Sequence, residues 1–400
     1  MLTSLGWIFF TGLVLGLAAK KVGLPPLVGM MAAGVVMGPY QLGILDESLL
    51  NIAPDLRQLA LILILTRAGL SLDLNALKKV GRSAILMCFV PACFEIAGMT
   101  IFAHHLLGVS YLEGAIIGAV VGAVSPAVIV PRMIRLHEEG WGARKGIPQM
   151  ILAGASADDI FVIIIFTALT GLADSGTVPT VGMLLEIPVS IVTGIGFGWI
   201  VGKGLAYLYT TYIKDNTHMV LLCLAASFFL VELETRLEGV IPFSGLLSVM
   251  AVGLSIQQHN QTATKALSST FSKLWIAGEI ILFVLVGAAV DLKYAQMAGL
   301  AAVVAVLGAL CVRALGVLLC TAGAGLNGKE RIFCVLAYLP KATVQAAIGG
   351  VPLAMGLACG QMVLTVAVIA ILVTAPLGAI AIDRSYSILL EKNLEKSVDK

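Results

Sequence analysis

The chain has 400 residues, of which 59% are hydrophobic and only 12% are charged. About a quarter of the residues of an ordinary soluble protein are charged, so this composition excludes a soluble fold. The formal net charge of +2 is too small to indicate nucleic acid as a partner, and the basic residues are spread over short loops rather than gathered in one patch.

Apolar runs that end at charged, glycine, proline or polar residues predict about thirteen spans of a lipid bilayer, because roughly 20 apolar residues cross a hydrocarbon core of about 30 Å. The first seven are expected near residues 3–20, 26–39, 57–72, 83–107, 111–131, 147–171 and 184–209. The other six are expected near residues 217–232, 239–257, 272–291, 297–323, 329–357 and 361–383. The sequence therefore predicts an all-α polytopic membrane protein in which residues 1–400 form a single membrane domain.

The basic residues indicate the orientation of these spans. Most of them lie in loops that follow odd-numbered spans, and the loops after even-numbered spans hold few. Those after odd-numbered spans include Lys20, Lys21, Lys78, Lys79, Arg82, Arg132, Arg135, Arg144, Lys145, Lys203, Lys214, Lys329 and Arg331. By the positive-inside rule the amino terminus is expected outside a cell membrane and the carboxyl terminus in the cytoplasm.

Thirteen spans divide into six, one linker and six, and this division predicts an inverted repeat. We expect a first six-helix repeat over residues 1–175, a linker helix over 180–212, a second repeat over 215–385 and a short cytoplasmic tail over 386–400. A linker that crosses the membrane once turns the second repeat upside down relative to the first, as in many secondary transporters.

Two spans are expected to be broken helices, at GAVSPAVIVP in the fifth span and AYLPKATVQAAIGG in the twelfth. Pro126, Pro131 and Pro340 each remove a main-chain donor and clash with the preceding turn. Broken backbone at membrane depth is tolerated where it is buried in protein or lines a wet cavity, so the two breaks are expected to cross at a binding site. The alternative is two independent proline kinks. Polar residues lie beside the breaks: Ser125, Lys341, Thr343 and Gln345.

Two neighbouring acids, Asp158 and Asp159, lie in the middle of the sixth span. An aspartate at the centre of a span costs about 2.5–3.5 kcal/mol, so this pair requires water, protons, a cation or a basic partner. Hydroxyl groups of Ser125 and Ser156 and carbonyls freed at the breaks could complete a site for a hard monovalent cation at Asp159. A carboxylate that binds either a cation or a proton would produce exchange directly. The alternative is an acidic pair that only holds helices together.

Three further charges lie at membrane depth. Lys341 needs a carboxylate or must lose its proton, and Asp158 is its expected partner. Cation entry at Asp159 would then weaken that pair and release a proton, unless Lys341 is only a static cap or bridge. Glu95 and Arg313 lie in the fourth and eleventh spans, at corresponding positions of the two halves, and are expected to form a structural ion pair.

With these motifs the chain resembles the cation/proton antiporter superfamily, and most of all its NHA branch of sodium/proton exchangers. The matching segments are GAVSPAVIVP, SADD, LFVLVGAAVDL and LPKATVQAAIG, and the resemblance covers nearly the whole chain. It implies a homodimer, a core of spans four to six and eleven to thirteen, a dimerisation scaffold of spans one to three and eight to ten, and an elevator-like movement. It also implies that Asp159 binds the cation and that Asp158 bonds to Lys341, and the pair of Glu95 and Arg313 is typical of the NHA branch.

The sequence is best interpreted as a sodium (or lithium)/proton antiporter, which is not an enzyme and needs no cofactor besides the ions it transports. A sodium-driven solute symporter is the strongest alternative, and the buried Lys341 argues against it. An intramembrane aspartyl protease is disfavoured because helix neighbours such as Asp158 and Asp159 point about 100° apart and no GxGD motif is present. A channel is disfavoured because no filter-like repeat is visible.

Overall fold

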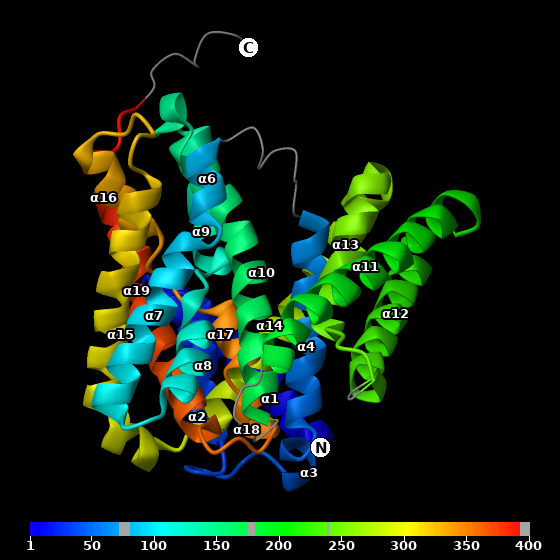
Figure 1. The fold of residues 1–400 in the computed structure, drawn as a ribbon. Helices are drawn as coiled ribbons and strands as arrows, with labels where there is room; N and C mark the ends of the chain where they lie inside the picture. The colour runs from blue at the N-terminus through cyan, green and yellow to red at the C-terminus, as the bar shows by residue number, and fades with distance from the viewer. Residues whose placement is uncertain (72–80, 175–180, 214, 238–239, 393–400) are drawn as a thin grey trace. The chain divides into compact units, whose positions relative to one another are not determined.

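The computed structural model describes residues 1–71, 81–174, 181–213, 215–237 and 240–392 (Figure 1). In this part of the chain every named element is a helix, and Trp141 and Lys392 form one isolated antiparallel bridge. The all-helical class is therefore confirmed. Eight of the described helical segments are long and apolar enough to cross a membrane: Leu2–Lys21, Arg82–Leu107, Tyr111–Glu138, Ile147–Asp174, Val189–Thr211, Gln261–Ala288, Gly299–Cys320 and Gly360–Leu389.

Contacts divide the chain into two compact units. The first unit comprises Met1–Leu50, Leu74–Leu169 and Phe283–Lys400. Its amino-terminal helices are α1 (Leu2–Lys21), α2 (Pro26–Met37), α3 (Glu47–Leu50), α6 (Arg82–Met87), α7 (Val90–Leu107), α8 (Tyr111–Gly122), α9 (Pro126–Glu138), the 3-10 helix η1 (Ala143–Lys145) and most of α10 (Ile147–Asp174). Its carboxyl-terminal helices are α15 (Leu292–Cys320), α16 (Gly328–Ala337), α17 (Thr343–Ile348), α18 (Val351–Ala354) and α19 (Gly360–Leu389).

The second unit comprises Asn51–Asp73 and Thr170–Leu282. Its helices are α4 (Ala53–Ser71), α11 (Val181–Thr211), α12 (Asn216–Leu237), α13 (Gly245–His259) and most of α14 (Gln261–Ala288). Glycines let two of these helices approach closely, because a Cβ on Gly194, Gly198 or Gly202 of α11 would collide with main-chain or side-chain atoms of α13. Small residues every four positions are typical of helix packing in membranes.

Most expected spans coincide with helices, and the exceptions have local causes. The expected span at 83–107 is two helices, α6 and α7, which meet at Cys88 and Phe89. Pro91 lies at the start of α7, has no main-chain N–H and disfavours helical backbone at the residue before it. The helix α14 begins at Gln261, before the expected residue 272, and α19 continues to Leu389, into the expected tail.

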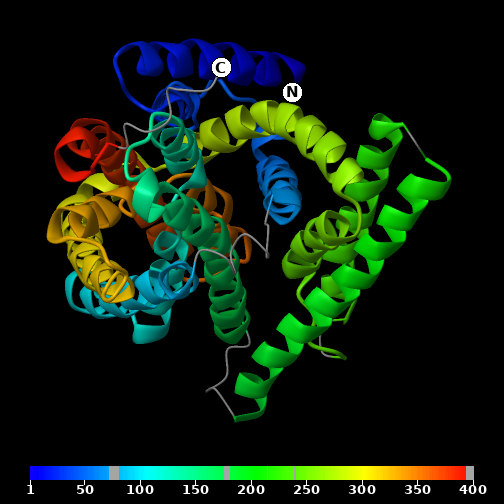
Figure 2. The ribbon, with the colours of Figure 1, turned by 90° about the horizontal axis from the view of Figure 1, so that it is seen from above.

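Helices α7 and α15 form one long contact inside the first unit, and Figure 2 shows them side by side in cyan and yellow. Gly98 of α7 lies against Val312, and Gly308 and Gly316 of α15 lie against aromatic rings of α7. At each of these positions an added Cβ would come within 3.3 Å of the partner side chain, so the two axes can approach only because glycine is present. This close contact brings Glu95 of α7 and Arg313 of α15 to the same level of the unit.

The carboxyl-terminal end of α19 and the residues that follow it are bonded to α9 and to the α9–α10 loop of the same unit. Asp383 accepts hydrogen bonds from Arg132 Nε and Nη2 at 3.0 and 2.9 Å, and from Arg135 Nη2 at 3.1 Å. The rings of Tyr386 and Trp141 meet edge to face, with centroids 5.3 Å apart. We call these contacts, with the Trp141–Lys392 bridge, the carboxyl-terminal strap.

We expect Asp383→Asn to lower the melting temperature of the purified protein only slightly. Its side chain is 37% exposed, so the ion pairs contribute no more than about 1 kcal/mol and are screened by salt. The measurement is thermal unfolding in detergent at low and high salt, with Glu232→Gln as control because Glu232 also pairs with an arginine, Arg236, at an exposed position. An effect that does not shrink at high salt would contradict this view of the strap.

Candidate functional site

Two interrupted helical segments lie in the first unit, at two of the places expected from the prolines. Helix α8 ends at Gly122 and α9 begins at Pro126, with extended backbone at Ala123 and Ser125 between them. Helix α16 ends at Ala337 and α17 begins at Thr343, with Pro340 between them. The expectation for Pro131 is wrong, because α9 continues through this residue without a break.

The two interruptions are joined by direct hydrogen bonds. The main-chain N–H of Ser125 donates to the carbonyl oxygen of Pro340 at 2.8 Å. The side-chain amide of Gln345 donates to the carbonyl oxygen of Ala123 at 2.8 Å, and its oxygen accepts the main-chain N–H of Ala342 at the same distance. Helices α8 and α17 are also in contact (Figure 1). The breaks are therefore not two independent kinks.

A buried cluster of four charged side chains lies beside the breaks. Arg313 Nη1 donates to Glu95 Oε2 at 2.6 Å, and Arg313 Nη2 donates to Asp158 Oδ2 at 3.0 Å. Lys341 Nζ donates to the same Glu95 oxygen at 2.6 Å. Each of the four side chains is at most 1% exposed. We call these residues the charge cluster.

The expected partner of Lys341 is therefore wrong. Lys341 bonds to Glu95, while Asp158 Oδ2 accepts from Arg313 and from the main-chain N–H of Val124 at 2.8 Å. The expected pair of Glu95 and Arg313 is present, but it is part of the charge cluster rather than a separate bridge. The rigid fork of an arginine can hold two carboxylates at once, and Lys341 shares with Arg313 the same oxygen of Glu95.

Arg313 also donates hydrogen bonds to main-chain carbonyl oxygens in the two interrupted segments. Its Nε donates to the carbonyl oxygen of Tyr338 at 3.0 Å, and its Nη1 donates to the carbonyl oxygen of Gly122. These carbonyls belong to the carboxyl-terminal ends of α8 and α16, where helix carbonyls lack intrahelical partners and the helix dipole favours a positive charge. One guanidinium group is therefore hydrogen-bonded to both helix breaks and to two carboxylates.

The charges of the cluster balance when all four groups are ionised, because Glu95 and Asp158 contribute two negative charges and Arg313 and Lys341 contribute two positive charges. Asp159 lies next to this neutral set, is only 6% exposed and makes no hydrogen bond or ion pair with a basic residue in the described part of the chain. A fifth buried charge without a counter-charge is expensive. A proton or a cation bound at Asp159 would supply the missing positive charge.

Several buried oxygens near the breaks have no hydrogen-bond partner among the described residues: Asp158 Oδ1, Asp159 Oδ1, Ser125 Oγ and Thr343 Oγ1. The large majority of buried polar atoms in proteins are hydrogen-bonded, so each such atom calls for an explanation. Carboxylate and hydroxyl oxygens are ligands that a hard cation accepts. The side chain of Ser156, the other expected ligand, lies outside the described part of the structure.

Sequence reasoning missed two residues of this region. Thr374 of α19 is buried, and its hydroxyl accepts the main-chain N–H of Lys341 at 2.9 Å, which fixes the backbone next to the break. Tyr338 is fully buried, and its ring lies 5.4 Å from the Arg313 guanidinium carbon. A lone threonine or tyrosine in an apolar span carries no spacing signal, so only the folded structure reveals these contacts.

The sequence matches a known protein family. A family model described as the transmembrane part of sodium/hydrogen exchangers matches residues 7–384. Sodium/hydrogen exchanger 9B2 of Mus musculus is 33% identical over 389 residues, which cover 94% of this chain and 70% of that protein. The protein of the same name from Homo sapiens is 33% identical over 394 residues, which cover 94% and 72% of the two chains.

A solved structure shows the same fold. The sodium proton antiporter MjNhaP1 from Methanocaldococcus jannaschii matches with a TM-score of 0.82 at 21% identity, over 97% of this chain and 98% of that chain. The fold similarity extends over nearly the full length of both proteins. The family model spans residues 7–384, and relatives from two mammals are 33% identical to this chain over alignments that cover 94% of it, so this chain belongs to the sodium/hydrogen exchanger family.

Proposed function

We propose that this protein exchanges sodium or lithium ions for protons across a membrane, and that its buried aspartates bind the cation and protons in competition. The observation that carries the proposal is the position of Asp159. It is a buried carboxylate beside two joined helix breaks, next to a charge cluster that is already neutral. Only a group without a permanent counter-charge can exchange one positive partner for another at little cost.

In this proposal the cation binds at Asp159, and oxygens of Ser125, Thr343 and Asp158 are available as further ligands. Each of these three side chains has a buried oxygen without a hydrogen-bond partner among the described residues. Protonation of Asp159 removes the negative charge that the cation requires, so occupancy by one excludes the other. Lys341 then keeps the charge of Glu95 balanced while the occupant of Asp159 changes.

The larger architecture is part of the same proposal. We assign thirteen spans in two inverted six-helix repeats, residues 1–175 and 215–385, joined by a linker helix over 180–212. We also propose a homodimer in the cell membrane, with the amino terminus outside and the carboxyl terminus in the cytoplasm. Within each protomer, an elevator-like movement of one bundle relative to the other would provide alternating access. The six spans expected to form the transport core all lie in the first unit, which supports this assignment. Helices α1 and α2, expected in the scaffold, also cluster with that unit.

The test is cation-induced proton movement in proteoliposomes that contain the purified protein and a trapped pH-sensitive dye. Addition of Na⁺ or Li⁺ should drive protons across the membrane, and K⁺ should have a smaller effect. No pH change with any of the three cations, in protein shown to be folded, would overturn the proposal. Sodium-dependent uptake of an organic solute would favour the symporter alternative instead.

A further inference from the structure

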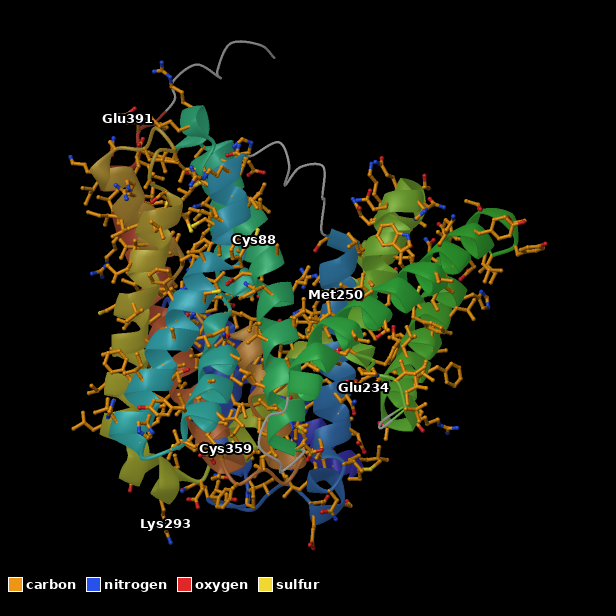
Figure 3. The ribbon with its side chains drawn as sticks, in the orientation of Figure 1. Cys88, Glu234, Met250, Lys293, Cys359 and Glu391 are labelled. Carbon is orange, nitrogen blue, oxygen red and sulfur yellow. The ribbon has the colours of Figure 1, made fainter. Side chains whose placement is uncertain are left out.

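Helix α19 contacts both interrupted segments of the first unit. It packs against α8 and α9 of the first segment and against α16 and α17 of the second (Figure 1). It begins after Cys359 and ends shortly before Glu391, both labelled in Figure 3, so its 30 residues extend over about 45 Å of the unit. A helix that contacts all four parts can set the position of one break relative to the other.

Two residues of α19 contact the second break directly. The hydroxyl of Thr374 accepts the main-chain N–H of Lys341 at 2.9 Å. A Cβ added to Gly378 would collide with Cγ of Pro340, and it would lie 2.8 Å from Cδ and 3.1 Å from the nitrogen of that proline. Thr374 and Gly378 are four positions apart and therefore share one face of the helix. We call these two residues the α19 seat.

The α19 seat leaves the break little freedom to move. The ring of Pro340 is closed onto its own main chain, so it cannot turn away from a methyl group as a flexible side chain can. Carbon atoms in contact lie about 3.5–4.0 Å apart, so even alanine at position 378 would displace the main chain of the break. Lys341 lies between α16 and α17, so its N–H has no acceptor within a helix, and buried Thr374 supplies one.

The residues held by the α19 seat are directly connected to two of the proposed cation ligands. The carbonyl oxygen of Pro340 accepts the main-chain N–H of Ser125 at 2.8 Å. Thr343 lies two residues after Lys341 and begins α17. The hydroxyl oxygens of Ser125 and Thr343 are buried and have no hydrogen-bond partner among the described residues. Metal sites tolerate deviations of about 0.2 Å in ligand distances, so a small shift of the break would weaken a site built from these oxygens.

We infer that Thr374 and Gly378 are positioning residues for cation binding. They hold the second break so that the hydroxyl oxygens of Ser125 and Thr343 can serve as ligands of the proposed cation. The inference rests on the proposed function. Neither residue of the α19 seat touches the cation in this arrangement, so each acts only through the main chain of the break. Their loss should therefore change the cation affinity more than the maximal rate of exchange.

The first test is Gly378→Ala, with sodium-induced proton movement in proteoliposomes measured over a range of sodium concentrations. We expect the sodium concentration of half-maximal exchange to rise by about tenfold, because displaced ligands bind the cation more weakly, while the maximal rate changes little. Gly204→Ala is the matched control, since a methyl group at this exposed position of α11 meets no atom within 4 Å. An unchanged half-maximal concentration in folded Gly378→Ala protein would overturn the inference.

The second test is Thr374→Val, which nearly keeps the shape of the side chain and removes the hydroxyl. The half-maximal sodium concentration should rise by about two- to tenfold, the factor that one hydrogen bond is worth, and Thr374→Ser should stay near the wild-type value. Thr365→Val is the matched control, because Thr365 is also buried on α19 but donates to the carbonyl oxygen of Gln361 in its own helix, at 2.8 Å. Equal effects of the two valine variants would overturn the role of Thr374.

A double-mutant cycle with Pro340→Ala shows whether Gly378 acts through the break. Without the proline ring there is room for a methyl group at position 378, so Gly378→Ala should have a smaller effect in the Pro340→Ala background than in the wild type. The cycle can be measured by the half-maximal sodium concentration and by the melting temperature, so it does not require Pro340→Ala to be active. Equal effects in both backgrounds would overturn the inference.

Amide hydrogen exchange separates this inference from the proposed function, because it requires no transport. Peptides that contain Lys341 and Ser125 should exchange faster in Gly378→Ala, and the Lys341 peptide should exchange faster in Thr374→Val but not in Thr365→Val. A wild-type protein that moves no protons would refute the exchange function, while faster amide exchange in these variants would still support the contacts of the α19 seat. Unchanged amide exchange in both peptides would refute the α19 seat alone.

Discussion

Asp159→Asn should reduce sodium-induced proton movement in proteoliposomes to the level of protein-free liposomes. Asparagine has nearly the shape of aspartate, but it cannot take up a proton near neutral pH or neutralise a cation. The charge cluster of Glu95, Asp158, Arg313 and Lys341 stays neutral in this variant, so its hydrogen bonds need not rearrange. The melting temperature should therefore stay at or above the wild-type value while exchange is lost, because a costly buried charge has been removed.

Two variants act as controls for this result. Asp215→Asn makes the same chemical change at an exposed loop position and should leave exchange unchanged. The main-chain N–H of His218 donates to Asp215, which lowers the pKa of that carboxyl below its ordinary value, so it stays ionised throughout the assay. Ser125→Ala removes one neutral ligand and should weaken the apparent sodium affinity without abolishing exchange. Residual exchange in Asp159→Asn would indicate that Asp158, rather than Asp159, is the carboxylate that exchanges the cation and protons.

The positions of the spans and breaks could be read from the sequence because each depends on local chemistry. The length of an apolar run sets the length of a helix, and a proline inside a span can mark an interruption because it lacks a main-chain donor. Pro340 and Pro126 each lie at an interruption, but Pro131 does not. Pro131 lies in the second turn of α9, where it removes one main-chain hydrogen bond without ending the helix.

The partners within the charge cluster could not be read from the sequence. The sequence showed which charges lie deep in the membrane, but which carboxylate a lysine reaches depends on how α7, α10 and α15 are rotated about their axes. The glycines of α7 and α15 bring Glu95 into reach of Arg313, and Lys341 reaches Glu95 from the break between α16 and α17. Asp158 is turned instead toward the main chain of Val124. Tertiary packing of this kind leaves no short-range pattern in a single sequence.

Arg313→Met should cause the largest loss of stability among the variants considered. Methionine fills a similar volume, but the change leaves Glu95 and Asp158 with one positive partner, Lys341, and removes the donor from two helix-end carbonyls. Removing one partner of a buried ion pair costs about 3–5 kcal/mol. The melting temperature in detergent should fall by on the order of 10 °C. Arg236→Met is the control, since Arg236 pairs with Glu232 at an exposed position.

The double variant Arg313→Met with Asp158→Asn decides which role of Arg313 dominates. If the loss arises from unbalanced charge, this variant should be more stable than Arg313→Met alone, because Glu95 and Lys341 then form a neutral pair. Two residues in direct contact should show such non-additivity in a double-mutant cycle. If the double variant is no more stable, the carbonyl oxygens of Gly122 and Tyr338 are the groups that need Arg313. In that case the arginine acts mainly to hold the two helix breaks together, and its effect on charge balance is secondary.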